Sequence, residues 1–179
     1  GTELAVLIFF RNDIKQIISA WFRQITKRPA MSSTEKSDAR MGWLIIIGSL
    51  PIAVLGYLGR DVIRNDFRSL WLIASTLIIF GVILGIADKY GNSNRDLSNL
   101  SVRDGLLYGF AQSLALIPGV SRSGATIAMG RFLGYSRPAA LRYSFLLALP
   151  AVFGSGFYEL KGALADGGDT GTFTISETL

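Results

Sequence analysis

The sequence predicts an all-α, polytopic integral membrane protein, and three observations support this prediction. Hydrophobic residues make up 50% of the chain and charged residues only 17%, whereas soluble domains usually carry about 25% charged residues. The apolar residues are gathered into blocks instead of recurring at an amphipathic period. Three blocks, 41–59, 70–87 and 143–158, contain no charged residue. Each approaches the roughly 20 residues that a helix needs to cross a bilayer, so three buried helices of a soluble core are the weaker explanation.

The charged residues indicate a membrane topology and not a nucleic-acid surface. The net charge is +5, but the basic segment 11–40 lacks the interleaved aromatic and basic residues of a nucleic-acid site. We therefore expect a lipid bilayer as a partner and no nucleic acid. Basic loops mark the cytoplasmic side of a membrane protein. The chain contains neither cysteine nor histidine, which excludes disulfides and histidine-based catalysis within it.

This charge bias predicts a single transmembrane domain with a defined order of segments. The short apolar run at 4–10, followed by Arg11, indicates a helix whose beginning has been removed. The expected segments are the end of a transmembrane helix at 1–10, a basic cytoplasmic loop at 11–40, transmembrane helices at 41–59 and 70–87, a cytoplasmic loop at 88–103, a re-entrant hairpin at 104–135, a transmembrane helix at 139–159 and a polar external tail at 160–179. The arginines between 60 and 68 fit this topology least well, because it places them outside.

The segment 104–135 is expected to enter and leave the membrane on the same side. Its first apolar stretch, 104–117, would form a helix of about 20 Å, which is too short to cross the hydrocarbon core. Basic residues stand at both flanks, at Arg103 and Arg137. If both flanks are cytoplasmic, the segment is a re-entrant helix–loop–helix hairpin.

Glycines within the apolar segments suggest close packing between helices. Gly81 and Gly85 are spaced as GxxxG, and so are Gly130 and Gly134. This spacing lets the backbones of membrane helices approach one another. Because it is common in membrane helices generally, it carries no information about activity.

The tip of the expected hairpin, 118–126, reads PGVSRSGAT and carries the candidate functional residues. An arginine at membrane depth is costly and is a functional hypothesis by default. Hydroxyl groups and glycines surround Arg122, at Ser121, Ser123, Thr126, Gly119 and Gly124. A helix that begins near Ser123 would direct its N–H groups to the same point, and this combination favours a phosphate. Alternatively, the hydroxyls cap the helix and Arg122 pairs with a neighbouring carboxylate. No GxxxxGK[ST] pattern is present, so nucleotide binding is not indicated.

The sequence of this expected hairpin tip resembles the signature of a known protein family. PGVSRSGAT matches every fixed position of PGxSRSxxT, the signature of the undecaprenyl-diphosphate phosphatases, or bacitracin-resistance family. The similarity extends through FAQSLALIPGVSRSGATIAMGRFLG and YSFLLALPAVFGSG, and also through the segment 4–11, the basic loop and GSLPIAVLG. It covers essentially the whole chain.

The resemblance implies a multi-pass enzyme of the bacterial cytoplasmic membrane, built as an inverted-repeat helix bundle with two re-entrant hairpins. Such an enzyme hydrolyses undecaprenyl diphosphate, a polyprenyl diphosphate lipid, to the monophosphate used in peptidoglycan synthesis, and thereby confers bacitracin resistance. By position, Arg122 would bind and neutralise the diphosphate, and Ser121 would hydrogen-bond it or take part in the transfer. The remaining substrate-site residues would be Gly119, Ser123, Gly124 and Thr126.

The chain departs from the family pattern in one respect. The first hairpin of the family carries an ExxxE segment, a serine and a histidine, which are associated with a divalent cation (Mg or Ca). No segment here matches it, and we interpret 32–34, SST, as a loop or a helix cap. The metal ligands are therefore expected in a segment that this chain lacks, and the chain alone is expected to be inactive.

The sequence leaves three features of the protein undecided. A carrier of prenyl phosphates or anions is the alternative function, because re-entrant hairpins in inverted repeats also build transporters; a purely structural membrane subunit is the third class. Gln112 either faces the cavity or bonds a neighbouring helix, whereas Asp88 and Asp104 are expected to cap helices or face solvent. The oligomeric state is undetermined, with a homo-oligomer among the alternatives.

Overall fold

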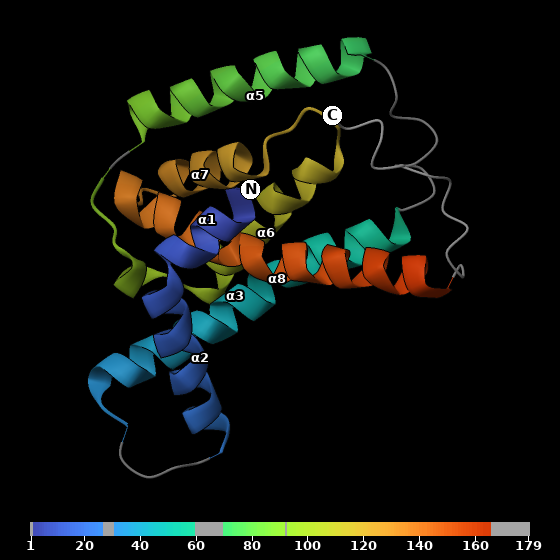
Figure 1. The fold of residues 1–179 in the computed structure, drawn as a ribbon. Coiled ribbons are helices and arrows are strands. Elements are labelled where there is room, and N and C mark those ends of the chain that lie inside the picture. The colour runs from blue at the N-terminus through green and yellow to red at the C-terminus, as the bar shows by residue number, and fades with distance from the viewer. Residues whose placement is uncertain (1, 27–30, 60–69, 92, 166–179) are drawn as a thin grey trace.

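The computed structural model describes residues 2–26, 31–59, 70–91 and 93–165, and almost all of these residues are helical (Figure 1). The prediction of an all-α chain is confirmed for this part of the molecule. The expected arginines at 60–68 and most of the expected polar tail lie outside the described residues. The elements are α1 (Thr2–Phe9), α2 (Arg11–Ile25), α3 (Ser33–Leu58), α5 (Leu70–Tyr90), η1 (Leu97–Asn99), α6 (Val102–Ser113), η2 (Leu114–Leu116), α7 (Arg122–Phe132) and α8 (Arg137–Ala165).

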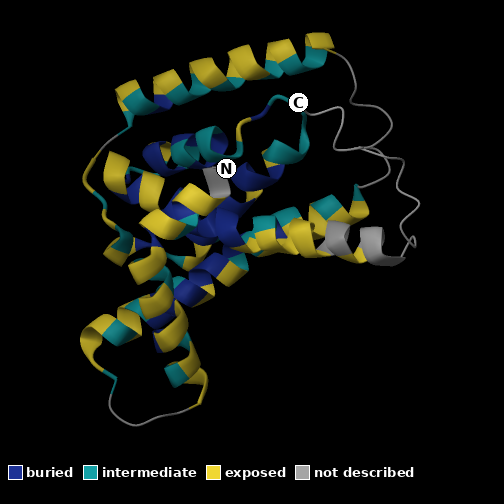
Figure 2. Cartoon of the chain, in the orientation of Figure 1, coloured by how far each residue is buried: buried dark blue, intermediate teal, exposed yellow. Residues whose placement is uncertain are grey.

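Three of these helices are long and apolar enough to cross a membrane, as the uncharged blocks predicted. They are α3, α5 and the segment Arg137–Phe157 of α8. The 21 residues of α5 correspond to roughly 31 Å, close to the ~30 Å hydrocarbon core of a bilayer. Figure 2 shows that α5 exposes most of its surface, and apolar side chains such as Trp71 and Ile78 point outward. A helix that is apolar on all sides suits a lipid environment.

The helix bounds extend beyond the uncharged blocks. α3 begins at Ser33 and α8 continues to Ala165, so both helices include polar residues next to their apolar stretches. The segment 11–40 contains α2 and the first turns of α3. Which flanks face the cytoplasm stays a prediction.

A capping box starts α3. The Ser32 hydroxyl accepts a hydrogen bond from the Glu35 N–H (3.2 Å), and the Glu35 carboxylate accepts one from the Ser32 N–H (2.9 Å). The segment 32–34 is therefore a helix cap, one of the two interpretations left open for it. Glu35 also pairs with Arg23 of α2, which ties the end of α2 to the start of α3.

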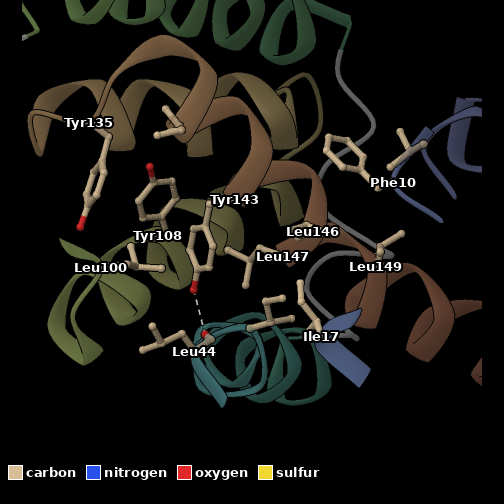
Figure 3. Packing of buried hydrophobic residues seen from close by; sticks show 14 residues of the cluster. Phe10, Ile17, Leu44, Leu100, Tyr108, Tyr135, Tyr143, Leu146, Leu147 and Leu149 are labelled. Carbon is tan, nitrogen blue, oxygen red and sulfur yellow. Dashed lines mark hydrogen bonds between the residues drawn. The ribbon is translucent and has the colours of Figure 1, made fainter. Parts of the chain in front are cut away.

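The core is formed mainly by α3, α6 and α8, with Phe10 and Ile17 contributed from the α1–α2 region (Figures 2 and 3). Tyr143 of α8 donates its hydroxyl hydrogen to the Leu44 carbonyl of α3 at 2.8 Å, and its ring meets that of Tyr108 edge to face at 4.8 Å. The backbones of α3 and α6 touch, because a β-carbon on Gly109 would lie 2.2 Å from the Gly48 carbonyl oxygen. Glycine at this crossing brings two helices into direct backbone contact.

The GxxxG spacing predicted packing contacts, and only part of this prediction is correct. Gly130 packs tightly, because a β-carbon there would lie 1.9 Å from the Tyr108 hydroxyl oxygen. Gly134 instead forms a turn after α7, with φ of +86°. At Gly81 and Gly85 a β-carbon would meet no atom of the described chain within 4 Å. Spacing alone did not distinguish these cases, because a contact also requires a helix on the facing side.

Candidate functional site

α6 and α7 pack against each other as a helical hairpin, and ion pairs and backbone contacts join its two ends. The Asp104 carboxylate, in the first turn of α6, accepts hydrogen bonds from Arg95 Nη2 (2.7 Å) and from the Tyr135 hydroxyl (2.7 Å). Arg95 also exchanges backbone hydrogen bonds with Gly134 and Ser136, just after α7. The connection before α6 and the chain after α7 are thus joined at one base.

Asp104 both caps a helix and forms a buried ion pair. Its N–H bonds the Ser101 hydroxyl in a capping box, as expected for a helix-capping residue. However, Asp104 is only 5% exposed, so the alternative that it faces solvent is wrong. The S-x-x-D pattern at 101–104 indicates the cap, whereas nothing in the sequence identifies Arg95 and Tyr135 as its partners.

At this base, the interactions around Asp104 keep its carboxylate and the Arg95 guanidinium ionised. Burial alone would raise the pKa of Asp104, but hydrogen bonds from Tyr135, Arg95 and Ser101 outweigh burial and lower the pKa below its ordinary value. The hydrogen bond to Asp104 raises the pKa of Arg95. Burial, followed by the bond to Asp104, raises the pKa of Tyr135, so that its hydroxyl stays neutral and donates.

A buried arginine, Arg131, holds the end of α7 in place. Arg131 is only 2% exposed, and its guanidinium donates to the Tyr135 carbonyl (2.7 Å) and to the Gly91 carbonyl (2.7 Å). Asp88, at the end of α5, lies 3.6 Å from Arg131 Nε and also accepts a hydrogen bond from Arg137 at 2.9 Å. The sequence suggested only that basic residues follow α7. The partners of Arg131 in and after α5 could not be predicted, because they are distant along the chain.

At the tip of the hairpin, a tight turn precedes α7. The Val120 N–H donates to the Ile117 carbonyl (3.1 Å), and Gly119 adopts φ of +90°. Pro118 followed by a glycine with positive φ is typical of a type II turn. Space also requires glycine here, because a β-carbon on Gly119 would lie 2.1 Å from Oγ1 of Thr76. The Thr76 hydroxyl donates to the Pro118 carbonyl (2.8 Å), so α5 holds the turn in place.

Ser121 is the N-cap of α7, and Arg122 is the first residue of the helix. The exposed Ser121 hydroxyl accepts from the Gly124 N–H at 3.2 Å and lies 3.4 Å from the Ser123 hydroxyl. Arg122, Ser123 and Gly124 are partly exposed. The first N–H groups of a helix have no intrahelical acceptor, so the helix start favours an anion.

Thr126 lies behind this first turn. Its side chain is fully buried, and its hydroxyl donates to the Arg122 carbonyl (2.9 Å) and to the Ser123 carbonyl (3.1 Å). The structure therefore brings five of the six predicted residues to the tip and puts Thr126 beneath them, where it braces the backbone of Arg122 and Ser123.

Gln112 lies in the last turn of α6 and is completely buried. Neither atom of its amide has a hydrogen-bond partner in the described part of the chain. Tyr108 faces Gly130 across the hairpin, so one turn closer to the tip Gln112 is level with Thr126. Among the described residues the amide therefore has no bond to a neighbouring helix.

The chemistry of the tip suits an anion and not a cation. Its polar groups are hydroxyls, backbone N–H groups and a guanidinium, whereas Mg²⁺ and Ca²⁺ require oxygen ligands, mainly carboxylates. No group of three acidic side chains among the described residues could hold a metal ion. These residues do not form a site for the divalent cation that the resemblance implies.

Comparison with known protein families supports the resemblance that the sequence of the tip suggested. Residues 1–177 match the sequence profile of the family described as "Bacitracin resistance protein BacA". The chain belongs to the BacA family. The match covers all described helices, including the α6–α7 hairpin, and places them in a family of bacterial membrane proteins.

Curated members of the BacA family are close relatives of this chain. It is 59% identical over 179 residues to an undecaprenyl-diphosphatase of Micrococcus luteus, matching 100% of this chain and 64% of that protein. It is 53% identical over 178 residues to one of Paenarthrobacter aurescens, matching 99% and 63%. An "Undecaprenyl-diphosphatase 2" of Agrobacterium fabrum is 53% identical over 180 residues, matching 98% and 64%. The chain thus spans somewhat less than two thirds of the length of these relatives.

Proposed function

We propose that this chain supplies the phosphate-binding half of an undecaprenyl-diphosphatase. The complete enzyme would hydrolyse undecaprenyl diphosphate to undecaprenyl phosphate and inorganic phosphate, which returns the lipid carrier to peptidoglycan synthesis and confers bacitracin resistance. The observation that carries the proposal is the tip itself, where PGVSRSGAT forms a tight turn and begins α7 at Arg122. The names of the 53–59% identical relatives supply the substrate.

The arrangement of the tip suits a diphosphate. The reaction breaks the bond between the bridging oxygen and the terminal phosphorus, and water supplies the new oxygen of the released phosphate. Negative charge spreads over the phosphoryl oxygens in the transition state, so catalysis depends on positioning and neutralisation. Arg122 would neutralise this charge through its planar fork of donors. Ser121, with its exposed hydroxyl at the helix start, would hydrogen-bond a phosphoryl oxygen or take part in the transfer.

We further propose that the α6–α7 hairpin is re-entrant. The 12 and 11 residues of its helices correspond to roughly 18 and 17 Å, well short of the ~30 Å core. The Arg95–Asp104 and Tyr135–Asp104 bonds hold both ends of the hairpin at one base, which supports entry and exit on the same side. In the full-length protein this hairpin would be one member of an inverted repeat. The divalent cation would be held by residues other than those described here.

The test uses a full-length hybrid, in which the Micrococcus luteus relative supplies the parts of its length that this chain does not match. The hybrid is purified in detergent with Mg²⁺ or Ca²⁺, and phosphate release from undecaprenyl diphosphate is measured. We expect Arg122→Ala to lower kcat about 10²–10³-fold, as removal of one charge-stabilising donor does in other enzymes. Arg122→Lys should recover only part of this loss, because an ammonium cannot form the bidentate fork.

Arg103→Ala is the matched control, because Arg103 is an exposed arginine in the first turn of α6, away from the tip. It should release phosphate at the rate of the parent hybrid. A folded parent hybrid that binds the lipid but releases no phosphate would contradict the enzymatic proposal and favour a carrier.

A further inference from the structure

An apolar groove lies where α1 and α2 meet α3 and α8, on the side of the molecule away from α5. α1, α2, α3 and α8 line this groove, whose volume is about 330 Å³. We call it the α2 groove; the residues of its walls used below are Ile18, Trp21, Phe22, Ile46, Leu149 and Phe153. The volume lies in the range of small-molecule sites, and all of its lining side chains are apolar.

α2 has the character of a helix at a membrane surface. Figure 1 shows that it runs across the direction in which α3, α5 and α8 extend. One side buries Ile17 and Ala20, whereas polar residues, including the exposed Arg11 and Lys15, occupy much of the remaining surface. Its ionisable residues are Arg11, Lys15 and Arg23 against Asp13 alone. A basic amphipathic helix that lies across the spans is suited to the headgroup region.

Two basic residues of α2, Arg11 and Lys15, lie on the same side of the helix as part of the groove wall. Residues 11, 15, 18 and 22 are spaced four, three and four positions apart, so they form one stripe along the helix. Ile18 and Phe22 of this stripe line the α2 groove and are 49% and 56% exposed. Arg11 and Lys15, both exposed, are the next positions along the same stripe. Two exposed cations therefore lie on the same side of α2 as the exposed apolar residues of the groove wall.

The direction of the groove matches half of a bilayer. Arg142 pairs with Asp13 near the start of α2, and α8 then lines the groove as far as Phe153. The eleven residues from 142 to 153 rise about 16 Å along the helix, roughly half of the ~30 Å hydrocarbon core. Trp21, in the second half of α2, also lies in the wall, and tryptophan is enriched at membrane interfaces.

We propose that the α2 groove binds one acyl chain of an anionic membrane phospholipid, whose headgroup phosphate lies against Arg11 and Lys15. The apolar walls accept the chain, and the two cations select the anionic headgroup. This site is distinct from the hairpin tip, and the proposal does not depend on the proposed hydrolysis.

The test measures contact between Trp21 and lipid in the full-length hybrid, with every other tryptophan replaced by Phe. The protein is reconstituted in phosphatidylcholine vesicles that contain equal mole fractions of either dibrominated phosphatidylglycerol or dibrominated phosphatidylcholine. Bromine quenches tryptophan fluorescence on contact. We expect the phosphatidylglycerol to be preferred about fivefold or more, and the double variant Arg11→Gln/Lys15→Gln to abolish this preference while retaining quenching by both lipids.

The matched control is Lys89→Gln/Arg103→Gln, which removes two exposed cations away from the groove; it should keep the preference. Equal quenching by both lipids in the parent, or a preference that survives the Arg11/Lys15 change, would overturn the proposal. Absence of quenching would also overturn it, because another part of the full-length protein would then cover the groove. Displacement of the brominated phosphatidylglycerol by undecaprenyl phosphate, but not by unlabelled phosphatidylglycerol, would assign the groove to the isoprenoid instead.

Discussion

The Tyr108 hydroxyl lies against the backbone of Gly130, so closely that a β-carbon on residue 130 would come within 1.9 Å of its oxygen. Tyr108 is fully buried, and in the described part of the chain its hydroxyl has no hydrogen-bond partner. The contact therefore serves packing, and it sets the distance between the two helices of the hairpin.

Gly130→Ala should force α6 and α7 apart. Overpacking of a well-packed core usually costs about 1–3 kcal/mol, so we expect a lower thermal unfolding midpoint of the full-length hybrid in detergent. Tyr108→Phe removes the oxygen that meets the new methyl group, but Cζ of residue 108 and the Ala140 side chain would still lie within 2.8 Å of it, so the double variant should recover only part of the loss. If the two destabilisations were simply additive, the close approach of Tyr108 to Gly130 would not be their cause.

Acidification should weaken the base of the hairpin through Asp104. Its pKa is lowered in the folded protein, because hydrogen bonds from Tyr135, Arg95 and Ser101 outweigh the burial that would raise it. A depressed carboxyl pKa contributes stability above the ordinary value of about 3.9, and this contribution is lost as the pH falls through the lower folded-state pKa. We therefore expect the thermal unfolding midpoint to decrease as the pH is lowered from the ordinary carboxyl pKa toward the lower folded-state pKa of Asp104.

Asp104→Asn is the corresponding substitution. Removing one partner of a buried ion pair costs about 3–5 kcal/mol; because the Arg95 side chain is 35% exposed, we expect about 2 kcal/mol at neutral pH. The variant should also lose part of the acid sensitivity below pH ~4. An unfolding midpoint that depends on pH in the same way in both proteins would exclude Asp104 as the titrating group.

Gly119→Ala should disturb the tip more than the fold. Alanine disfavours the φ of +90° at this position, and its methyl group would meet Thr76 and the backbone of Ile73 in α5. We expect the turn to shift and kcat for phosphate release from the hybrid to fall at least about tenfold. Gly154→Ala is the control, because a β-carbon there meets no described atom within 4 Å. Full activity of Gly119→Ala would show that the position of the turn is unimportant.

Ser121→Ala separates capping from chemistry. Loss of an N-cap side chain costs about 1 kcal/mol of stability, and Ser32→Ala removes a cap of the same kind from α3. We expect both variants to lose similar stability but only Ser121→Ala to lower kcat, by about tenfold or more. Parallel measurements of unfolding midpoint and phosphate release test this. Equal activities of the two variants would leave Ser121 with a capping role alone.

Local features of the sequence were sufficient to predict much of the fold. The uncharged block at 41–59 ends one residue beyond α3, and the blocks at 70–87 and 143–158 lie within α5 and α8. The cap at Ser32 was one of the two interpretations left open for 32–34, and the helix expected near Ser123 begins directly after its N-cap, Ser121. The residues of the tip are contiguous, so their proximity follows from the motif. These features depend on hydropathy and hydrogen bonding within a few residues, and the sequence alone determines them.

The contacts that assemble the helices were decided only in the tertiary structure. Arg142 pairs with Asp13 across 129 residues, and Tyr143 donates to Leu44 across 99. The partners of Asp104 lie outside its own helix. The periodicity of the sequence does not reveal such pairs. Each pair forms only after two helices have packed against each other, as α3 and α6 do at Gly48 and Gly109. The sequence thus determined which segments are apolar helices and where the proposed phosphate-binding loop lies, whereas helix packing decided how the base of the hairpin is held.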